Sequence, residues 1–351
     1  MNPYSALPPE AFWKTGVERS NPFQIENLYT KKWSIARRHK IATAGSCFAQ
    51  HISRYMNRSG YEVLNVEPTP GGLPQELAQK YGYSMYSARY GNIYTLLQLL
   101  QLLREAAGTI QIDDEDLAWQ RPDGAYIDAF RPAVEPDGLP TVAEVRKHRE
   151  YHLSRVREMF QNMDIFVFTM GLTETWENAA TSLVYPSVPG VFGGTFDPEV
   201  YKFRNIGFAD NLRAFRQFHK ELVEFRGKRP LRYLLTVSPV PLTATASGEH
   251  VLPATVYSKS VLRAVAGQLA QDHRYVDYFP SYEIITNQAA RSVFYENNLR
   301  SVRNDGVETV MKVFFSQHPR LSALPAKAGK SAEKTEEDVQ CEEAVLEAFG
   351  R

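Results

Sequence analysis

Three features are scarce or absent in this sequence, and each absence excludes a class of protein. Cysteine occurs only twice in 351 residues, as Cys47 and Cys341, which excludes a disulfide framework of the secreted type. Lysine plus arginine and aspartate plus glutamate both number 40, so no net basic charge favours nucleic acid. No apolar run approaches the length of a membrane span. We therefore expect a soluble, cytoplasmic protein that binds no nucleic acid and does not span a membrane.

Short apolar runs alternate with amphipathic helical patterns along most of the chain. The apolar runs cover residues 41–44, 61–66, 164–170, 231–237 and 275–279, and the helical patterns lie within 142–160, 212–222, 261–269 and 307–314. This alternation predicts an α/β fold built on a three-layer, doubly wound, mostly parallel sheet. In such a sheet, ligands bind beyond the carboxyl ends of the strands.

Several segments depart from this alternation and suggest how the chain is divided. Residues 1–39 mix proline with aromatic residues and are expected to form an N-terminal arm. Residues 111–140 and 179–205 are rich in proline and glycine, which indicates irregular insertions at the rim of a pocket. Residues 319–351 are expected to form a polar, partly disordered tail with at most one short helix. The main domain is then 40–318.

One serine lies where a strand is expected to turn into a helix. Gly45-Ser46-Cys47-Phe48-Ala49 follows the first apolar run, and a hydroxyl at this position is exposed to backbone N–H groups at the start of the helix. Ser46 is therefore a candidate nucleophile, although serine is also a preferred helix cap. Cys47 is either a rival nucleophile or a small buried residue.

The segment Gly45–Ala49 resembles the motif for which the GSCFA family is named, a family similar to the SGNH (GDSL-like) hydrolases. Five further segments agree with this resemblance in the expected order: YGNIY at 90–94, GLTETW at 171–176, VSPV at 237–240, SK at 258–259 and YFPSYE at 278–283. Together they form a specific signal, although each alone is weak.

The resemblance implies roles for several residues at the first three motifs. Ser46 corresponds to the acyl nucleophile, and the N–H groups around Ser46 and Cys47 correspond to part of the oxyanion hole. Gly91 corresponds to a second oxyanion donor, with Asn92 beside it. Thr173 stands where the SGNH enzymes carry the oxyanion asparagine, and its hydroxyl can still donate one hydrogen bond.

The last motif departs from the SGNH pattern. Those enzymes carry Asp-x-x-His before the final helix, whereas this chain has Asn298 and Ser301 at the two positions, and neither accepts a proton at neutral pH. His250, in the loop after the 231–237 run, is the candidate for a relocated base, and the alternative is an exposed loop histidine. Glu174 or Glu283 could orient its imidazole as the third member of a triad.

These features predict an SGNH-like serine ester hydrolase or O-acyltransferase that needs no cofactor and no metal ion. Its substrate is expected to be a small-molecule ester, with a carbohydrate ester suggested by family analogy alone. The competing expectation is a binding or assembly protein that keeps the pocket but has lost the Asp-x-x-His pair.

Overall fold

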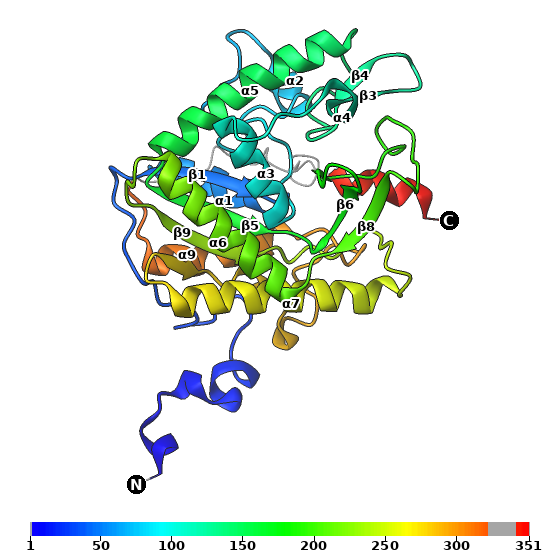
Figure 1. The fold of residues 1–351 in the computed structure, drawn as a ribbon. Helices are drawn as coiled ribbons and strands as arrows, with labels where there is room; N and C mark the ends of the chain where they lie inside the picture. Colours follow the sequence, from blue (N-terminus) through cyan, green and yellow to red (C-terminus); the bar gives the residue numbers. More distant parts are fainter. Residues whose placement is uncertain (1, 322–341, 351) are drawn as a thin grey trace.

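The computed structural model describes residues 2–321 and 342–350, so Cys341 lies outside the described residues. Its centre is a five-stranded sheet in the order β2-β1-β5-β9-β10, with every neighbouring pair parallel (Figure 1). The strands are β1 (Lys40–Gly45), β2 (Glu62–Val63), β5 (Ile165–Met170), β9 (Arg232–Val237) and β10 (Val276–Tyr278). The expected doubly wound parallel sheet is confirmed, although β2 is much shorter than the 61–66 run.

Helices cover both faces of the sheet and complete three layers (Figure 1). One face packs against α3 (Leu96–Ala107), α5 (Val142–Asn162), α6 (Phe208–Phe225) and α7 (Val251–Asp272). The other packs against α1 (Ala49–Arg58), α8 (Ser281–Thr286) and α9 (Asn304–Gln317). Alternate residues of β1 enter the two cores, since Ala42 and Ala44 face the first and Ile41 faces the second.

Two of the longer helices, α3 and α7, differ from the sequence-based expectation. Helix α3 was not expected, yet its start is a capping box in which Thr95 Oγ1 accepts from Gln98 N at 3.2 Å and Gln98 Oε1 accepts from Thr95 N at 2.9 Å. Helix α7 begins at Val251, ten residues before the 261–269 pattern. Its first turns are not recognisable in the sequence, because Leu252 and Val256 are exposed there and form no buried apolar stripe.

The two insertions are mostly irregular, as expected, but each contains short regular elements. The first holds α4 (Asp114–Leu117) and an antiparallel pair, β3 (Ala118–Gln120) and β4 (Tyr126–Asp128). The second, with the residues before it, forms an antiparallel sheet of β6 (Glu174–Asn178), β7 (Val184–Tyr185) and β8 (Tyr201–Asn205) in the order β7-β6-β8. Such short strands contain too few residues for the two-residue alternation to be recognised.

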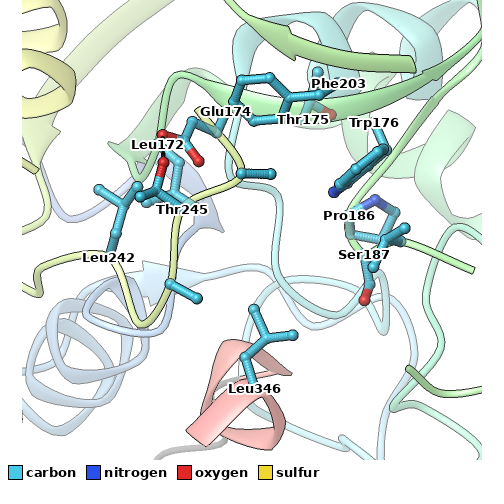
Figure 2. A pocket seen from close by; sticks show the side chains of 13 residues that line it. Leu172, Glu174, Thr175, Trp176, Pro186, Ser187, Phe203, Leu242, Thr245 and Leu346 are labelled. Atoms are coloured by element: carbon cyan, nitrogen blue, oxygen red, sulfur yellow. Dashed lines mark hydrogen bonds between the residues drawn. The ribbon is translucent and has the colours of Figure 1, made fainter. Parts of the chain in front are cut away.

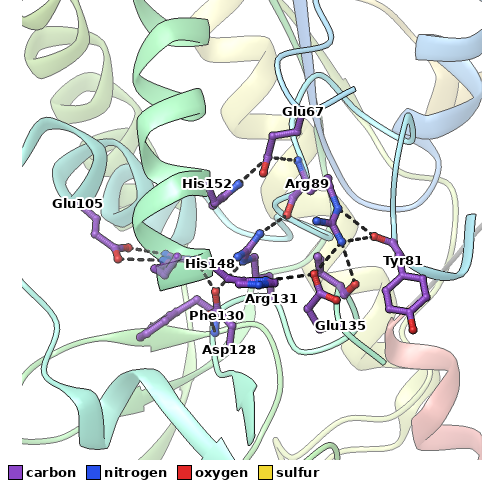
Figure 3. A network of polar contacts seen from close by, with 12 residues as sticks. Glu67, Tyr81, Arg89, Glu105, Asp128, Phe130, Arg131, Glu135, His148 and His152 are labelled. Carbon is purple, nitrogen blue, oxygen red and sulfur yellow. Dashed lines mark hydrogen bonds and ion pairs between the residues drawn. The ribbon is translucent and has the colours of Figure 1, made fainter. Parts of the chain in front are cut away.

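A buried polar network joins the chain that follows β2 to α5 and β4 (Figure 3). The Arg131 guanidinium donates to Asp128 at 2.6 Å and to the Arg89 carbonyl at 3.2 Å. Arg89 N donates to Glu67 at 2.6 Å, and the same Glu67 oxygen lies 2.7 Å from His152 Nδ1. Because buried charges are costly unless paired, this network fixes the segment that follows Arg89.

The ends of the chain are less closely integrated with the domain. From residue 2 on, the N-terminal arm forms three short helical segments, η1 (Pro3–Ala6), η2 (Pro9–Ala11) and η3 (Lys14–Glu18), and this part extends away from the domain (Figure 1). Its later part is anchored where the Tyr29 hydroxyl donates to Asp277 Oδ2 at 2.9 Å. The remaining short helices are α2 (Gln75–Lys80), η4 (Gln288–Ala290) and η5 (Glu342–Phe349). Within residues 2–321 and 342–350, no helix has both the length and the apolar character needed to cross a bilayer.

Candidate active site

The serine of the GSCFA segment lies at the carboxyl end of β1, beside the end of β5. Gly45 has a φ of +132°, and a Cβ at this position would lie 2.3 Å from the Thr169 carbonyl oxygen, so only glycine fits. Ser46 N donates to that same carbonyl at 3.1 Å. From β1 the chain continues to β2 on one side and then crosses to β5 on the other side. The place between the carboxyl ends of β1 and β5 is therefore the switch point where doubly wound sheets bind ligands.

Ser46 does not cap the helix that follows, so the capping alternative is wrong. Helix α1 begins at Ala49 with Phe48 at the cap position, and the Ser46 carbonyl accepts from Ala49 N at 2.8 Å. Ser46 is 3% exposed, and its hydroxyl forms no hydrogen bond with any described residue. Cys47 is buried and precedes the helix.

Two more buried hydroxyls without partners lie along the same stretch of β5 and the loop after it. Thr169 Oγ1 and Thr173 Oγ1 are both buried and form no hydrogen bond within the described part of the chain. Buried polar atoms are nearly always paired in folded proteins, so three orphan hydroxyls near one switch point call for an explanation. A ligand with its own polar atoms would provide the missing partners.

The loop that carries Gly91 and Asn92 is tied to the serine turn. The Tyr86 hydroxyl lies 3.0 Å from the Ser46 carbonyl oxygen and 2.6 Å from Asn92 Oδ1. Ile93 N donates to the Gly45 carbonyl at 3.0 Å. Gly91 itself has a φ of +67°, a left-handed conformation that glycine adopts without strain. The structure therefore brings the first two motifs together.

The third motif packs directly against the serine, and α7 holds it there. A Cβ on Gly171 would lie 3.0 Å from Ser46 Cβ. Lys259 Nζ donates to the Gly171 carbonyl at 2.7 Å, and Ser258 Oγ accepts from Thr173 N at 3.1 Å. Lys259 is only 1% exposed. Ser258 and Lys259 form one of the segments that resemble the family, but they precede the 261–269 helical pattern, and no local signal in the sequence indicates a role for them.

Among the described residues, no hydrogen bond joins the Ser46 hydroxyl to the proposed base or to its orienting carboxylates. His250 is exposed, and its Nδ1 accepts from Leu252 N at 3.1 Å at the start of α7. Glu283 forms an ion pair with Arg263 and accepts from the Tyr278 hydroxyl at 2.7 Å. Glu174 contacts neither His250 nor Glu283 through a hydrogen bond.

The loop that departs from the SGNH pattern is closed on itself. Asn298 Oδ1 accepts from Arg300 N and Ser301 N, both at 2.9 Å, and Asn298 Nδ2 donates to Ser301 Oγ at 3.0 Å. This pairing uses the polar atoms of both residues within the loop. Neither is directed to the serine hydroxyl, which has no partner among the described residues.

A cavity of about 190 Å³ is lined by Leu172, the residue after Gly171, and by residues from several other segments (Figure 2). Its walls are largely apolar and come from Leu172 and the start of β6, the 186–188 segment, β8, the 242–246 loop and η5. The lining residues are Leu172, Glu174, Thr175, Trp176, Pro186, Ser187, Val188, Phe203, Leu242, Ala244, Thr245, Ala246 and Leu346. Glu174 has the only ionisable side chain among these residues. Burial raises its pKa above the ordinary value, against the opposing hydrogen bond from Thr245 Oγ1 at 2.7 Å.

No cluster of three or more metal-ligating side chains occurs within the ranges that the structure describes. Comparison with known proteins assigns the chain by its sequence: residues 40–314 match the GSCFA family. The chain belongs to the GSCFA family. The match covers the whole sheet and every motif described above, so the GSCFA segment, the Gly91 loop and the 171–173 turn are parts of one family domain. No curated protein and no solved structure matches the chain.

Proposed function

We propose that this GSCFA protein is a serine acyl-ester enzyme of the SGNH type, a hydrolase or an O-acyltransferase, with Ser46 as its nucleophile. The observation that carries the proposal is the Ser46 hydroxyl, buried without a hydrogen-bond partner among the described residues, at the switch point of a doubly wound sheet. The neighbouring orphan hydroxyl of Thr173 supports it, because acyl transfer needs donors close to the nucleophile.

The proposed reaction begins when Ser46 Oγ attacks the ester carbonyl carbon and its proton passes to a base. The carbonyl oxygen becomes an oxyanion that accepts from the Thr173 hydroxyl and the Gly91 N–H. Ser46 N is already bonded to the Thr169 carbonyl, which favours Gly91 and Thr173 over the serine's own N–H as donors. The tetrahedral intermediate then releases the alcohol, which takes up the proton, and leaves an acyl-serine. Water or a second hydroxyl completes hydrolysis or transfer.

His250 is the proposed proton acceptor, and it reaches Ser46 through a closing movement of the 241–250 loop. Its Nδ1 accepts from Leu252 N, so the neutral ring carries its proton on Nε2. Accepting a proton from Ser46 therefore requires the ring to leave its capping position. The same loop already lines the cavity through Leu242 and Thr245, so a closing movement would bring His250 toward bound substrate.

The substrate we propose is an uncharged ester, either of a small molecule or of a carbohydrate. The cavity that begins at Leu172 is lined by apolar walls but not by Ser46 itself, and its one carboxyl group, Glu174, has a raised pKa. Such a site disfavours a charged acyl group, since burying an unpaired charge is costly. With only two cysteines in the chain, we place the reaction in the reducing cytoplasm.

One observation favours a second candidate, a protein that binds ligand in the same pocket without hydrolysing it. Asn298 and Ser301 satisfy each other in an exposed loop, so the usual base is replaced by a neutral hydrogen-bonded pair. A GSCFA protein with this loop could hold an ester or an assembly partner at the orphan hydroxyls and leave it intact.

An aryl-ester assay separates the two candidates. We expect the full chain to hydrolyse p-nitrophenyl acetate, Ser46→Ala to lose at least about 100-fold in rate, and His250→Ala to lose roughly 100-fold to 10,000-fold. Ser260→Ala and His148→Ala alter exposed residues and serve as matched controls. A fluorophosphonate probe that labels the parent but not Ser46→Ala would identify the nucleophile directly. Equal rates and equal labelling in parent and Ser46→Ala would exclude the serine mechanism and favour the binding protein.

A further inference from the structure

A segment from the far end of the chain closes one side of the cavity that begins at Leu172, the residue after the Gly171 that packs against Ser46. Leu346 of η5 points toward the cavity from below, facing Trp176, Pro186 and the 242–246 loop in Figure 2. Leu346 is half-buried, whereas its neighbours Val345 and Phe349 are 39% and 65% exposed. The segment thus presents Leu346 to the cavity and leaves Val345 and Phe349 exposed.

A second contact joins the same segment to the domain. Glu347 Oε1 lies 3.7 Å from a guanidinium nitrogen of Arg300, whose side chain is only 12% exposed. Arg300 belongs to the loop that contains Asn298 and Ser301. The segment therefore contacts both the apolar cavity and the loop that departs from the SGNH pattern.

The contact of Leu346 with the cavity and the ion pair of Glu347 with Arg300 each contribute little stability. An ion pair with one exposed partner contributes little in water, and Glu347 is 55% exposed. A single half-buried leucine adds only part of the free energy that full burial would give. Such a segment stays bound when no ligand is present, but a ligand that covers the same apolar walls more completely displaces it.

We infer that residues 342–350 form a displaceable lid on the cavity, and that an uncharged, apolar ligand competes with Leu346 for it. The walls that Leu346 faces, Trp176 and Phe203 among them, are apolar, so the displacing ligand is apolar there as well. The inference rests on the cavity and the segment alone and does not require Ser46 to be a nucleophile. If the proposed ester chemistry also holds, the lid limits access of substrate to the same site.

The test measures binding of an uncharged fluorescent probe, Nile red, to the full chain in a Ser46→Ala background, so that ester chemistry plays no part. We compare Leu346→Asp with Val345→Asp, which places the same charge on the exposed neighbour. We expect Leu346→Asp to tighten probe binding at least five-fold and Val345→Asp to change it less than two-fold. A synthetic peptide of residues 342–350 should reverse the gain when added to Leu346→Asp.

Two further variants keep the test decisive. Adding Trp176→Ala to Leu346→Asp should abolish the gain, which places the probe in this cavity, and thermal melting confirms that each variant is folded. Glu347→Arg should loosen the lid and give a smaller gain than Leu346→Asp. Equal probe affinities for Leu346→Asp and Val345→Asp, or weaker binding after Leu346→Asp, would overturn the lid. Because Ser46 is absent throughout, either result leaves the proposed reaction to its own assay.

Discussion

Replacing Gly45 by alanine perturbs the contact between the ends of β1 and β5 that positions Ser46. The added Cβ would lie 2.3 Å from the Thr169 carbonyl oxygen and 2.7 Å from Thr169 N, closer than any real Cβ contact. These are backbone atoms of a central strand, so they cannot move aside as a flexible side chain would. The backbone φ of +132° adds strain, because residues with a Cβ rarely adopt it.

The expected cost has two parts. Holding alanine at this φ costs roughly 1–3 kcal/mol, and the overlap in a packed sheet costs roughly another 1–3 kcal/mol. Gly72→Ala is the matched control, since Gly72 has a φ of +83° but no atom within 4 Å of the added Cβ. The control should therefore lose only about 1–2 kcal/mol, from the backbone alone.

Urea unfolding followed by circular dichroism gives the free energies of unfolding of the parent, Gly45→Ala and Gly72→Ala. We expect Gly45→Ala to be destabilised by about 2 kcal/mol more than the control. Equal destabilisation of the two variants would refute the close approach of the strand ends. The geometry on which the serine site depends would then be wrong.

Two further predictions concern the buried polar network. Burial lowers the pKa of His152 to about 4, so the folded state keeps the ring neutral while the unfolded state binds a proton below its ordinary pKa. The free energy of unfolding should therefore fall by up to about 3 kcal/mol as the pH drops from about 6.5 to 4. Urea unfolding midpoints measured across that range should show a smaller loss for His152→Gln than for the parent. Arg149→Met would leave the buried carboxylates Glu105 and Asp128 without a cation that contacts both, at a cost of roughly 3–5 kcal/mol. Arg155→Met breaks the exposed ion pair with Glu158 and should cost under about 1 kcal/mol in the same urea series. Similar losses of stability for Arg149→Met and Arg155→Met would contradict the role of the buried network.

Local sequence patterns predicted most of the central domain but not all of its helices. Strands β1, β5 and β9 are continuous apolar runs because both of their faces are buried, and such runs are recognisable without a structure. Helix α3 was missed although Thr95 and Gln98 form a capping box and Gly108 ends the helix with a φ of +77°. Its leucines occur in adjacent pairs, which hides the helical period on which the other predictions depended.

The sequence by itself determined the class of fold and the position of Ser46 at the end of a strand, because both follow from apolar runs and the residues that bound them. Tertiary structure decided which groups surround that serine. Lys259 and Ser258 reach the 171–173 turn from a helix packed beside it, and His250 instead caps that helix. Leu346 meets the cavity from 170 residues beyond Trp176. Contacts of this range depend on how loops and helices pack in three dimensions, and no local pattern encodes them.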